Sequence, residues 1–187
     1  MKPLKTQMEE KMKLSEMIKR TKELLDKDTA DAAFEKALVN GINTAYLIIA
    51  RDKWRPVMRE EVTIENGTVK IKDLTKNFVS LKSAYTSCGF RLGAWAGKDA
   101  VHFPPWATKA EIEYFYLPAP LSGDNDEPDI PEAAVDVYAY IYFAAARYYS
   151  IKGQHAEASV WDTRYKNIVD NIREMQGCAI MHTERWV

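Results

Sequence analysis

The most constraining feature of this sequence is a segment, residues 131–152, that is apolar almost all the way round when it is drawn as a helix. It reads PEAAVDVYAYIYFAAARYYSIK, and only Glu132, Asp136 and Arg147 carry charge before its last residue. A helix with one apolar stripe can lie on a surface, whereas one that is apolar on several sides has to be enclosed. We therefore expect it to be buried or to lie at an interface, where its five tyrosines suit contacts that are part apolar and part hydrated.

The signals around this segment predict a helical hairpin. Asp129 can cap a helix, Pro131 suits its first position, and Glu132 completes a capping box. Gly153 and Gly177 stand where a first and a second helix are expected to stop, because glycine readily adopts the left-handed conformation that ends helices. The second helix, over residues 156–175, has a narrower apolar seam: Trp161, Tyr165, Ile168, Ile172 and Met175.

The rest of the chain predicts a helical pair followed by a small sheet. Helical spacing of apolar residues runs over residues 4–27 and again to about residue 50, with Asp28 and Thr29 offering a cap between the two helices. Gly41 lies in the apolar face of the second helix, where another backbone is expected to approach closely. From Val57 the period becomes alternating, and Asn66-Gly67 is a hairpin signal.

These elements indicate an α+β fold that is mainly helical. We expect one domain over residues 1–176, with helices at about 4–50 and 131–176 and an antiparallel sheet inserted at about 57–117. Residues 177–187 are expected to form a tail without helical period. Because it ends in Trp-Val and is rich in apolar residues, the tail is interpreted as a segment that becomes ordered on a partner rather than one that only frays.

Composition narrows the classes of function. A chain of 187 residues with a net charge of −1 has the size of one domain and lacks the basic excess of a dedicated nucleic-acid binder. Neither a membrane span nor a signal peptide is apparent, so a soluble protein made in the cytoplasm is expected. Cys88 and Cys178 are interpreted as a chance pair of buried or partly buried thiols rather than a disulfide.

Charge is unevenly distributed along the chain. Residues 51–98 hold ten basic and five acidic residues, whereas residues 99–136 hold one basic and nine acidic residues. Two solvated surfaces that happen to differ would explain this pattern. Neighbouring copies, or neighbouring rings, that meet with complementary charge would explain it equally well.

The C-terminal third carries a family resemblance. An edge strand ending in LPAPLS is followed by an acidic, proline-containing run, by IPEAAVDVYAYIYFAAARYY, and by a helix with Gly153, Ala158, Trp161 and Tyr165. This order resembles the phage head–tail adaptor proteins, also called connector or gateway proteins. The resemblance implies a structural virion protein that forms a ring, usually of twelve copies, beneath the portal and around the DNA channel.

The resemblance also implies partners and roles. Copies would pack side by side through Tyr138, Tyr142, Tyr149, Trp161 and Tyr165, and the tail, through Ile180, Met181, Trp186 and Val187, would dock on the portal protein. The glycine-rich segment 87–97 and the Asn66-Gly67 loop would reach toward a downstream tail or nozzle protein in the neck of the virion. A solvated face is the ordinary interpretation of the sheet's basic residues. In a ring adaptor some would face the next ring or passing DNA: Lys70, Lys72, Arg91 and the neighbouring Trp95.

Catalytic or metal chemistry is not indicated, so we expect no enzyme and no cofactor. His102, His155 and His182 lack the spacing of metal ligands. The glycine-rich segment has no phosphate-binding motif. Carboxylates in the acidic run could gather calcium, but the run lacks the glycine and later glutamate of an EF-hand: Asp124, Asp126, Glu127 and Asp129. The alternative function is a helical-hairpin scaffold or peptide-binding protein, which a single hairpin supports weakly.

Overall fold

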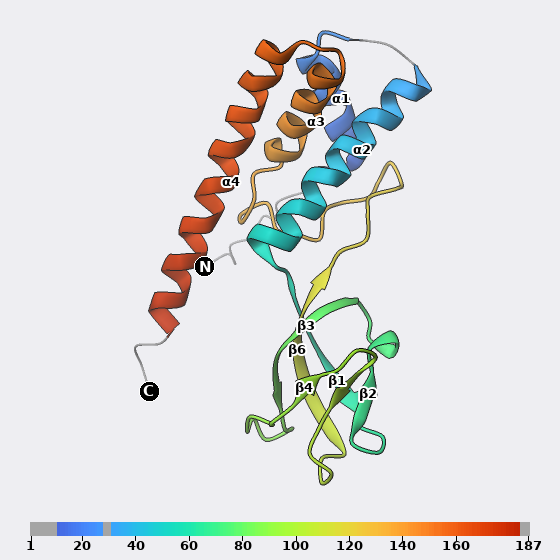
Figure 1. Cartoon of the computed structure of the whole chain (residues 1–187), viewed down its shortest axis with the longest axis vertical. Helices are drawn as coiled ribbons and strands as arrows, with labels where there is room; N and C mark the ends of the chain where they lie inside the picture. The colour runs from blue at the N-terminus through green and yellow to red at the C-terminus, as the bar shows by residue number, and fades with distance from the viewer. Residues whose placement is uncertain (1–10, 28–30, 184–187) are drawn as a thin grey trace, which may run out of the picture. The chain divides into compact units, whose positions relative to one another are not determined.

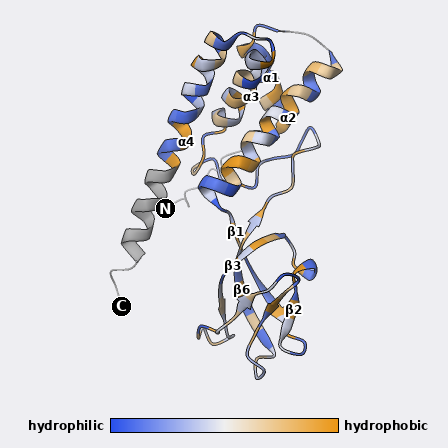
Figure 2. Cartoon of the chain, in the orientation of Figure 1, coloured by the Kyte–Doolittle hydropathy of each residue, from blue (hydrophilic) through white to orange (hydrophobic). Residues whose placement is uncertain are grey.

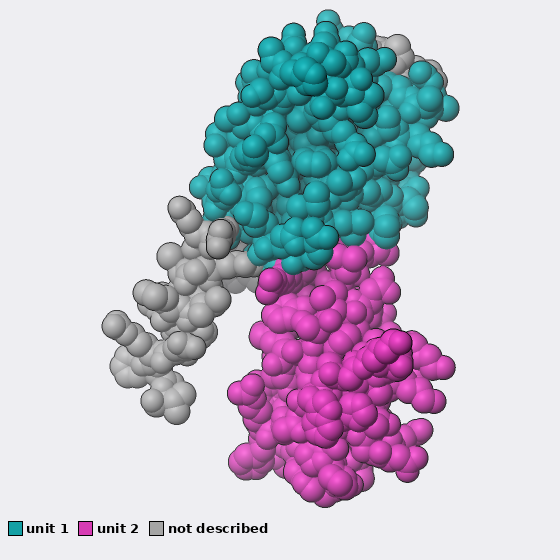
Figure 3. Space-filling model, in the orientation of Figure 1, with its two compact units in different colours: residues 1–54, 120–187 teal, residues 55–119 magenta. Residues whose placement is uncertain are grey.

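The fold is α+β, as predicted, and it divides into two compact units. The computed structural model describes residues 11–27 and 31–183, with side chains as far as Ile172. One unit, the helical unit, comprises residues 1–54 and 120–187, and the other, the sheet unit, comprises residues 55–119 (Figure 3). The predicted inserted sheet therefore corresponds to the second unit. None of the helices in the described residues is long and apolar enough to cross a membrane.

The helical unit is built around α3 (Tyr138–Ile151), the apolar segment singled out above. Helix α3 packs against α1 (Leu14–Leu24), α2 (Ala32–Ile49) and α4 (His155–Thr183), so three helices of the same chain enclose it (Figure 1). A short π-helix, η1 (Ala50–Trp54), extends α2 and contacts α4. Figure 2 shows the contrast in hydropathy between α2, which carries hydrophobic stretches, and the more hydrophilic coloured part of α4. The residues of α3 that become buried are Ala139, Tyr140, Ile141, Ala144, Ala145 and Ala146.

Gly41 marks a close crossing of two helices in this unit, as the sequence predicted. A Cβ atom placed on Gly41 would lie 3.0 Å from both Cα and Cβ of Ala144. Contacts that short are tighter than normal van der Waals packing, and a backbone atom cannot move aside without shifting its helix. Glycine at position 41 therefore lets α2 and α3 approach, and the small Ala144 completes the crossing.

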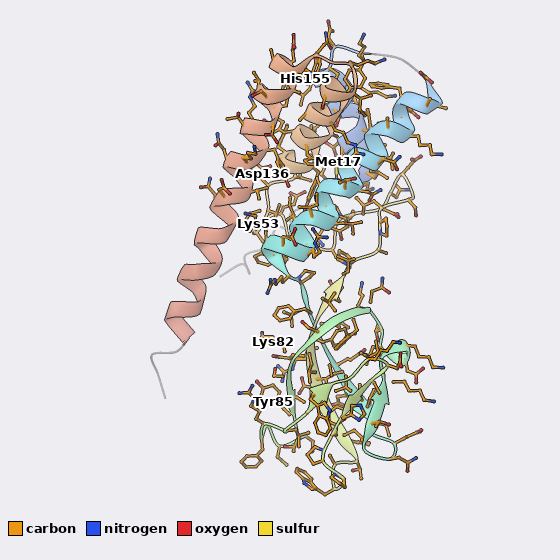
Figure 4. The ribbon with its side chains drawn as sticks, viewed as in Figure 1. Met17, Lys53, Lys82, Tyr85, Asp136 and His155 are labelled. Carbon is orange, nitrogen blue, oxygen red and sulfur yellow. The ribbon has the colours of Figure 1, made fainter. Side chains whose placement is uncertain are left out.

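The start of α3 differs from the prediction. The helix begins at Tyr138 rather than at Pro131, so the proposed capping box does not form. Glu132, which was predicted to complete the capping box, instead accepts a hydrogen bond from the backbone N–H of Met12 (2.7 Å). The Asp129 N–H donates a hydrogen bond to the Tyr46 hydroxyl (2.8 Å). Asp136, just ahead of α3 in Figure 4, accepts from the Tyr138 N–H. Tertiary hydrogen bonds to α2 and to the residues just ahead of α1 have replaced the local ones that the sequence favoured.

The end of α3 agrees with the prediction. Gly153 has a φ of +74°, and its N–H donates to Ser150 while the Gln154 N–H donates to Tyr149. These two bonds form a Schellman motif, which satisfies carbonyl groups at the end of the helix. The hairpin of α3 and α4 is thus set by one left-handed glycine.

Two other helix boundaries were predicted wrongly. Helix α4 does not stop at Gly177 but continues to Thr183, because a single glycine costs a helix only about 1 kcal/mol and no proline follows it. The cap of α2 is Asp31, whose carboxylate accepts from the Ala33 N–H (2.9 Å). The proposed caps Asp28 and Thr29, and the predicted helical residues 4–10, lie outside the described residues.

The sheet unit contains two antiparallel three-stranded sheets rather than the single sheet expected. One has the order β1 (Val57–Thr63), β6 (Lys109–Leu117), β3 (Asn77–Tyr85). The other has the order β2 (Thr68–Lys70), β5 (Ala100–His102), β4 (Trp95–Ala96), and a 3-10 turn, η2 (Ile71–Asp73), follows β2. Both sheets contribute to one core, which includes Val69, Val101, Ile112 and Tyr114.

The predicted turn at Asn66-Gly67 is present, but it joins the two sheets. Both residues have positive φ, and Glu65 and Thr68 exchange two backbone hydrogen bonds across the turn. Pairing stops there, because β1 continues against β6 and β2 against β5. The hairpin signal in the sequence was therefore correct for the turn and wrong for the strands beyond it.

Replacing Gly41 by valine tests the α2–α3 crossing. We expect Gly41→Val to lower the free energy of unfolding by about 1–3 kcal/mol, the usual cost of overpacking, as measured by denaturant titration. Asn40→Val is the matched control, because Asn40 is exposed on the same helix. Valine is a better helix former than glycine, so an unchanged or raised stability for Gly41→Val would contradict the proposed crossing.

Tyr114 gives the sheet unit a predictable response to alkali. Burial raises the pKa of Tyr114 to about 12, and its hydroxyl also donates to Glu60 (3.0 Å) and accepts from the Lys76 N–H (3.2 Å). An unfolded tyrosine ionises near pH 10. Between these two values the unfolded chain loses the proton first, so stability should fall as pH rises from 10 toward 12.

Tyr114→Phe should therefore cost about 1–2 kcal/mol at pH 7 and show a smaller further loss of stability between pH 10 and 12. Denaturant titrations at pH 7, 10 and 11.5 measure both effects. Tyr85→Phe, also in the sheet unit, serves as the control. Equal alkaline slopes for the Tyr114 variant and the unsubstituted chain would contradict this account.

Candidate interaction surfaces

The aromatic residues proposed for contacts between subunits pack against one another within a single chain. Ring centroids lie 5.6 Å apart for Tyr138 and Tyr142, and 5.6 Å apart for Tyr142 and Trp161, which joins α3 to α4. Arg164 lies over the Trp161 ring at 4.7 Å. At the other end Arg20 of α1 donates to the Tyr138 hydroxyl (2.6 Å). A ladder of rings with an arginine at each end thus links α1, α3 and α4.

None of the five proposed interface side chains is exposed in the single chain. Tyr165 is buried and its ring packs on Phe143 at 5.0 Å, while Tyr149 packs on Tyr148 at 5.6 Å. Burial raises the pKa of Tyr140 and of Tyr165, in agreement with the enclosed positions of these phenols. The aromatic content of α3 is therefore accounted for within one chain, and its role between copies stays a prediction.

Two other side chains of the helical unit are exposed instead. Ile151, the last residue of α3, is 70% exposed, and Val160 of α4 is 53% exposed. The sequence analysis did not single out either residue. The exposure of Val160 could have been predicted, since Val160 is not one of the residues of the apolar seam of its helix. That of Ile151 could not, because α3 is apolar on nearly every side and the neighbours decide which side stays open.

The seam of α4 is largely as predicted. Tyr165 and Ile172 are buried, as expected. Ile168 was also expected to be buried but is only half-buried, and its neighbour Val169 is buried instead. Of the proposed portal-docking residues, Ile180 and Met181 lie on the last turns of α4, whereas Trp186 and Val187 lie outside the described residues. Residues 177–183, which were predicted to belong to a tail without helical period, are therefore part of α4.

The sheet unit exposes three aromatic rings. Phe90 is 74% exposed, Trp106 is 68% exposed and Trp95 is 60% exposed. Phe90 and Trp106 lie in the loops that enter β4 and β6. These loops lie at the end of the β1–β6–β3 sheet where Thr63 pairs with Lys109, opposite to the end where the chain enters and leaves the unit. The three exposed aromatic side chains therefore lie on separate elements of the unit, two in loops and Trp95 in β4.

Trp95 is held in place by a stack. Its ring lies 5.2 Å from that of His102, with 11° between the ring planes. A Cβ atom on Gly97 would lie 2.9 Å from Nε2 of His102, so the absence of a side chain at position 97 makes room for the imidazole. Gly97 therefore helps to position the ring of Trp95, whereas a Cβ atom on Gly89 or Gly93 would meet nothing within 4 Å.

The four residues proposed to face the next ring or DNA are all exposed but do not form one cluster. Lys70 and Trp95 lie on the two strands that flank β5, and Lys72 lies in η2. Arg91 pairs with Tyr85 at the end of β3. The structure thus distributes these residues over both sheets.

The acidic loop of residues 121–130 caps helix α1. The N–H groups of Leu14 and Ser15 donate to the carbonyl oxygens of Asp126 (2.9 Å) and Asp124 (3.1 Å). The first N–H groups of a helix have no partner within it, and negative charge near them is favourable. The sequence analysis placed a helix cap in this acidic run but assigned it to the following helix, and it caps the first helix of the unit instead.

Two further contacts hold this loop. The Asn43 amide donates to the Leu121 carbonyl (2.8 Å) and accepts from the Leu121 N–H (2.7 Å). The Asp126 carboxylate accepts from the N–H groups of Gly123 (2.8 Å) and Ser122 (2.7 Å). Those backbone bonds, from Gly123 first and then Ser122, lower the pKa of Asp126. Loop, α1 and α2 thus form one hydrogen-bonded assembly.

The described residues offer no group of three or more His, Cys, Asp or Glu side chains that could hold a metal ion. His102 is stacked on Trp95, His155 begins α4 (Figure 4), and His182 lies near the end of α4. Cys88 is exposed, contrary to the expectation of a buried thiol, and Cys178 lies on α4.

Neither the family models nor the curated proteins to which the sequence was compared match this chain.

Asp126 gives the capping loop a predictable response to acid. Because its pKa is lowered in the folded chain, its contribution is fully present above the pKa of an unfolded aspartate, near 4, and is lost as pH falls through the folded value. We expect Asp126→Ala to lower the urea midpoint at pH 7 and to flatten the loss of stability below pH 4. Glu127→Ala, which changes an exposed carboxylate in the same loop, is the control. Identical acid slopes in both variants would rule out the role given to Asp126.

Proposed function

We propose that this chain is a head-to-tail adaptor of a tailed phage, which forms a ring beneath the portal, extends the DNA channel and provides the attachment site for the tail. In this role it is a structural protein of the virion neck and not an enzyme. Its partners are other copies of itself, the portal protein and a downstream tail or nozzle protein.

The observation that carries the proposal is the order of elements around the apolar helix. A helical pair, an inserted sheet, the LPAPLS segment, an acidic loop and a helical hairpin follow one another as in the family that the sequence resembles. The structure supports the functional interpretation of this order by one further fact. The acidic loop is a fixed part of the helical unit, bonded to α1 and α2, and so belongs to the scaffold.

The available surfaces fit a component that contacts several proteins. Ile151 and Val160 on the helical unit, and Phe90, Trp95 and Trp106 on the sheet unit, are exposed apolar side chains on separate elements. The near-neutral charge of the whole chain suits a channel through which DNA has to slide, because every added phosphate contact raises affinity. In this proposal DNA passes without a specific site.

The C-terminal segment is proposed to dock on the portal. It includes the last turns of α4, with Ile180 and Met181, and the terminal Trp186 and Val187. Docking of an apolar segment buries side chains that a solvated tail would leave exposed, and burial of each large side chain contributes about 1.5–3 kcal/mol.

Truncation after Gly177 tests this role. We expect the shortened chain to lose only the helical signal of residues 178–183 and to keep its cooperative unfolding, but to lose binding to the portal protein encoded in the same genome. Circular dichroism checks folding, and native mass spectrometry with isolated portal checks binding. The double substitution Trp186→Ala and Val187→Ala, compared with Lys36→Ala at an exposed site of α2, separates loss of side chains from loss of length. A truncated chain that joins portal normally would remove the docking role.

A further inference from the structure

We propose that copies of this chain join head to tail through two different surfaces of the helical unit. One surface is the open side of α3 around Ile151, and the other is the outer face of α4 around Val160 in the next copy. The proposal deepens the ring assembly proposed above and rests on it for its biological setting.

Helix α3 has one side that its own chain leaves open. With α1, α2 and α4 packed against it, the remaining exposed residues near its C-terminal end are Arg147, Ser150 and Ile151. These side chains stand between two hollows. A helix ridge flanked by hollows is the shape into which the side chains of another helix pack.

Both hollows lie within the helical unit. The first, of about 380 Å³, lies between α2 and α3 and has an apolar floor that includes Phe34, Ala37 and Tyr148. The second, of about 570 Å³, lies between α3 and α4 and is lined in part by Phe143 and Ala158. Arg147 and Ile151 line both hollows, so they form the ridge between them.

The complementary surface is the outer face of α4. In the described part of the helical unit, Ile151 and Val160 are the only large apolar side chains that are exposed. Val160 lines neither hollow. With 3.6 residues per turn, it lies about 140° around α4 from the buried Tyr165. The two exposed apolar side chains therefore belong to different surfaces.

Charge disfavours a contact of the open side of α3 with itself. Lys27, Arg147 and Lys152 line the first hollow. The acidic residue of the first hollow is Asp31, whose carboxylate caps α2. The acidic residue of the second hollow is Asp162, which forms an ion pair with Lys166 (2.6 Å). The open side of α3 is therefore rimmed by positive charge. Two such sides brought together would repel each other.

Glu157 supplies the opposite charge on the α4 surface. It lies on α4 within one turn before Val160, and no ion pair or hydrogen bond joins its side chain to another described residue. Arg164, about one turn after Val160, has its guanidinium over the rings of Trp161 and of Tyr142 on α3. Charge complementarity of this kind fixes register and steers association. Val160 packing beside Ile151, with Glu157 near Arg147 or Lys152, thus satisfies both the apolar and the charged groups.

A contact between two different surfaces is heterologous. Each copy then offers one surface of each kind, and successive copies form a closed ring when the rotation between neighbours divides a full turn. Because the contact needs two different surfaces, variants that each lack one surface should still pair with each other. An isologous dimer would not give this result.

The test uses two variants and their mixture. Ile151→Asp removes the apolar centre of the α3 surface, and Val160→Asp removes that of the α4 surface. Sedimentation velocity up to millimolar concentration, together with a zero-length amine–carboxylate cross-linker, measures self-association. Val79→Asp, an exposed valine of the sheet unit, is the matched control, and circular dichroism checks that all variants fold.

We expect the unsubstituted chain and the Val79 variant to associate and to yield a ladder of cross-linked species. Each single variant alone should associate at least about tenfold more weakly, a change of about 1.4 kcal/mol. An equimolar mixture of the two variants should regain association but stop at heterodimers, because the intact α3 surface of one meets the intact α4 surface of the other.

Three results would overturn the proposal. The first is an unsubstituted chain that stays monomeric at millimolar concentration. The second is a variant that associates alone as well as the unsubstituted chain does. The third is a mixture that forms no heterodimers. Failure of the adaptor function gives a different pattern, since heterodimers would still form while truncation after Gly177 left portal binding unchanged.

Discussion

The structure depends on the enclosure of α3. This helix is apolar on nearly every side, and leaving it in water would expose the residues that it now buries, Tyr140 and Ile141 among them. Helices α1, α2 and α4 cover three of its sides, and the close crossing at Gly41 and Ala144 brings α2 near enough to do so. The remaining side, around Arg147 and Ile151, is the part of the helix that the chain does not cover.

The enclosure depends in turn on the acidic loop. Helix α1 has no side-chain cap of its own, and its first N–H groups bond to carbonyl oxygens of the loop. Asn43 of α2 holds the same loop through Leu121, so one segment ties together two of the three helices that cover α3. The run of carboxylates suggests a solvated loop or a cation site in the sequence. In the structure this loop is hydrogen-bonded to both α1 and α2 and so connects them.

This arrangement changes which residues are available for assembly. The tyrosines and Trp161, which look like interface residues in the sequence, pack against one another and against two arginines within the chain. The association of copies that we propose would then use what remains exposed. On the helical unit these are two aliphatic side chains beside charged residues, which favours an interface of modest apolar area whose register is set by charge.

The sequence by itself determined the α+β class, the enclosed helix, the glycine at the α2–α3 crossing, the left-handed stop at Gly153 and the turn at Asn66-Gly67. Each of these follows from the period or the backbone freedom of a few neighbouring residues. Only the tertiary structure decided where α3 begins, that β1 and β2 belong to different sheets, what the acidic loop caps and which side of α3 stays open. The reason is that these outcomes depend on partners distant in sequence, such as Met12 for Glu132 and β6 for β1, and local patterns carry no information about which distant partner is nearest.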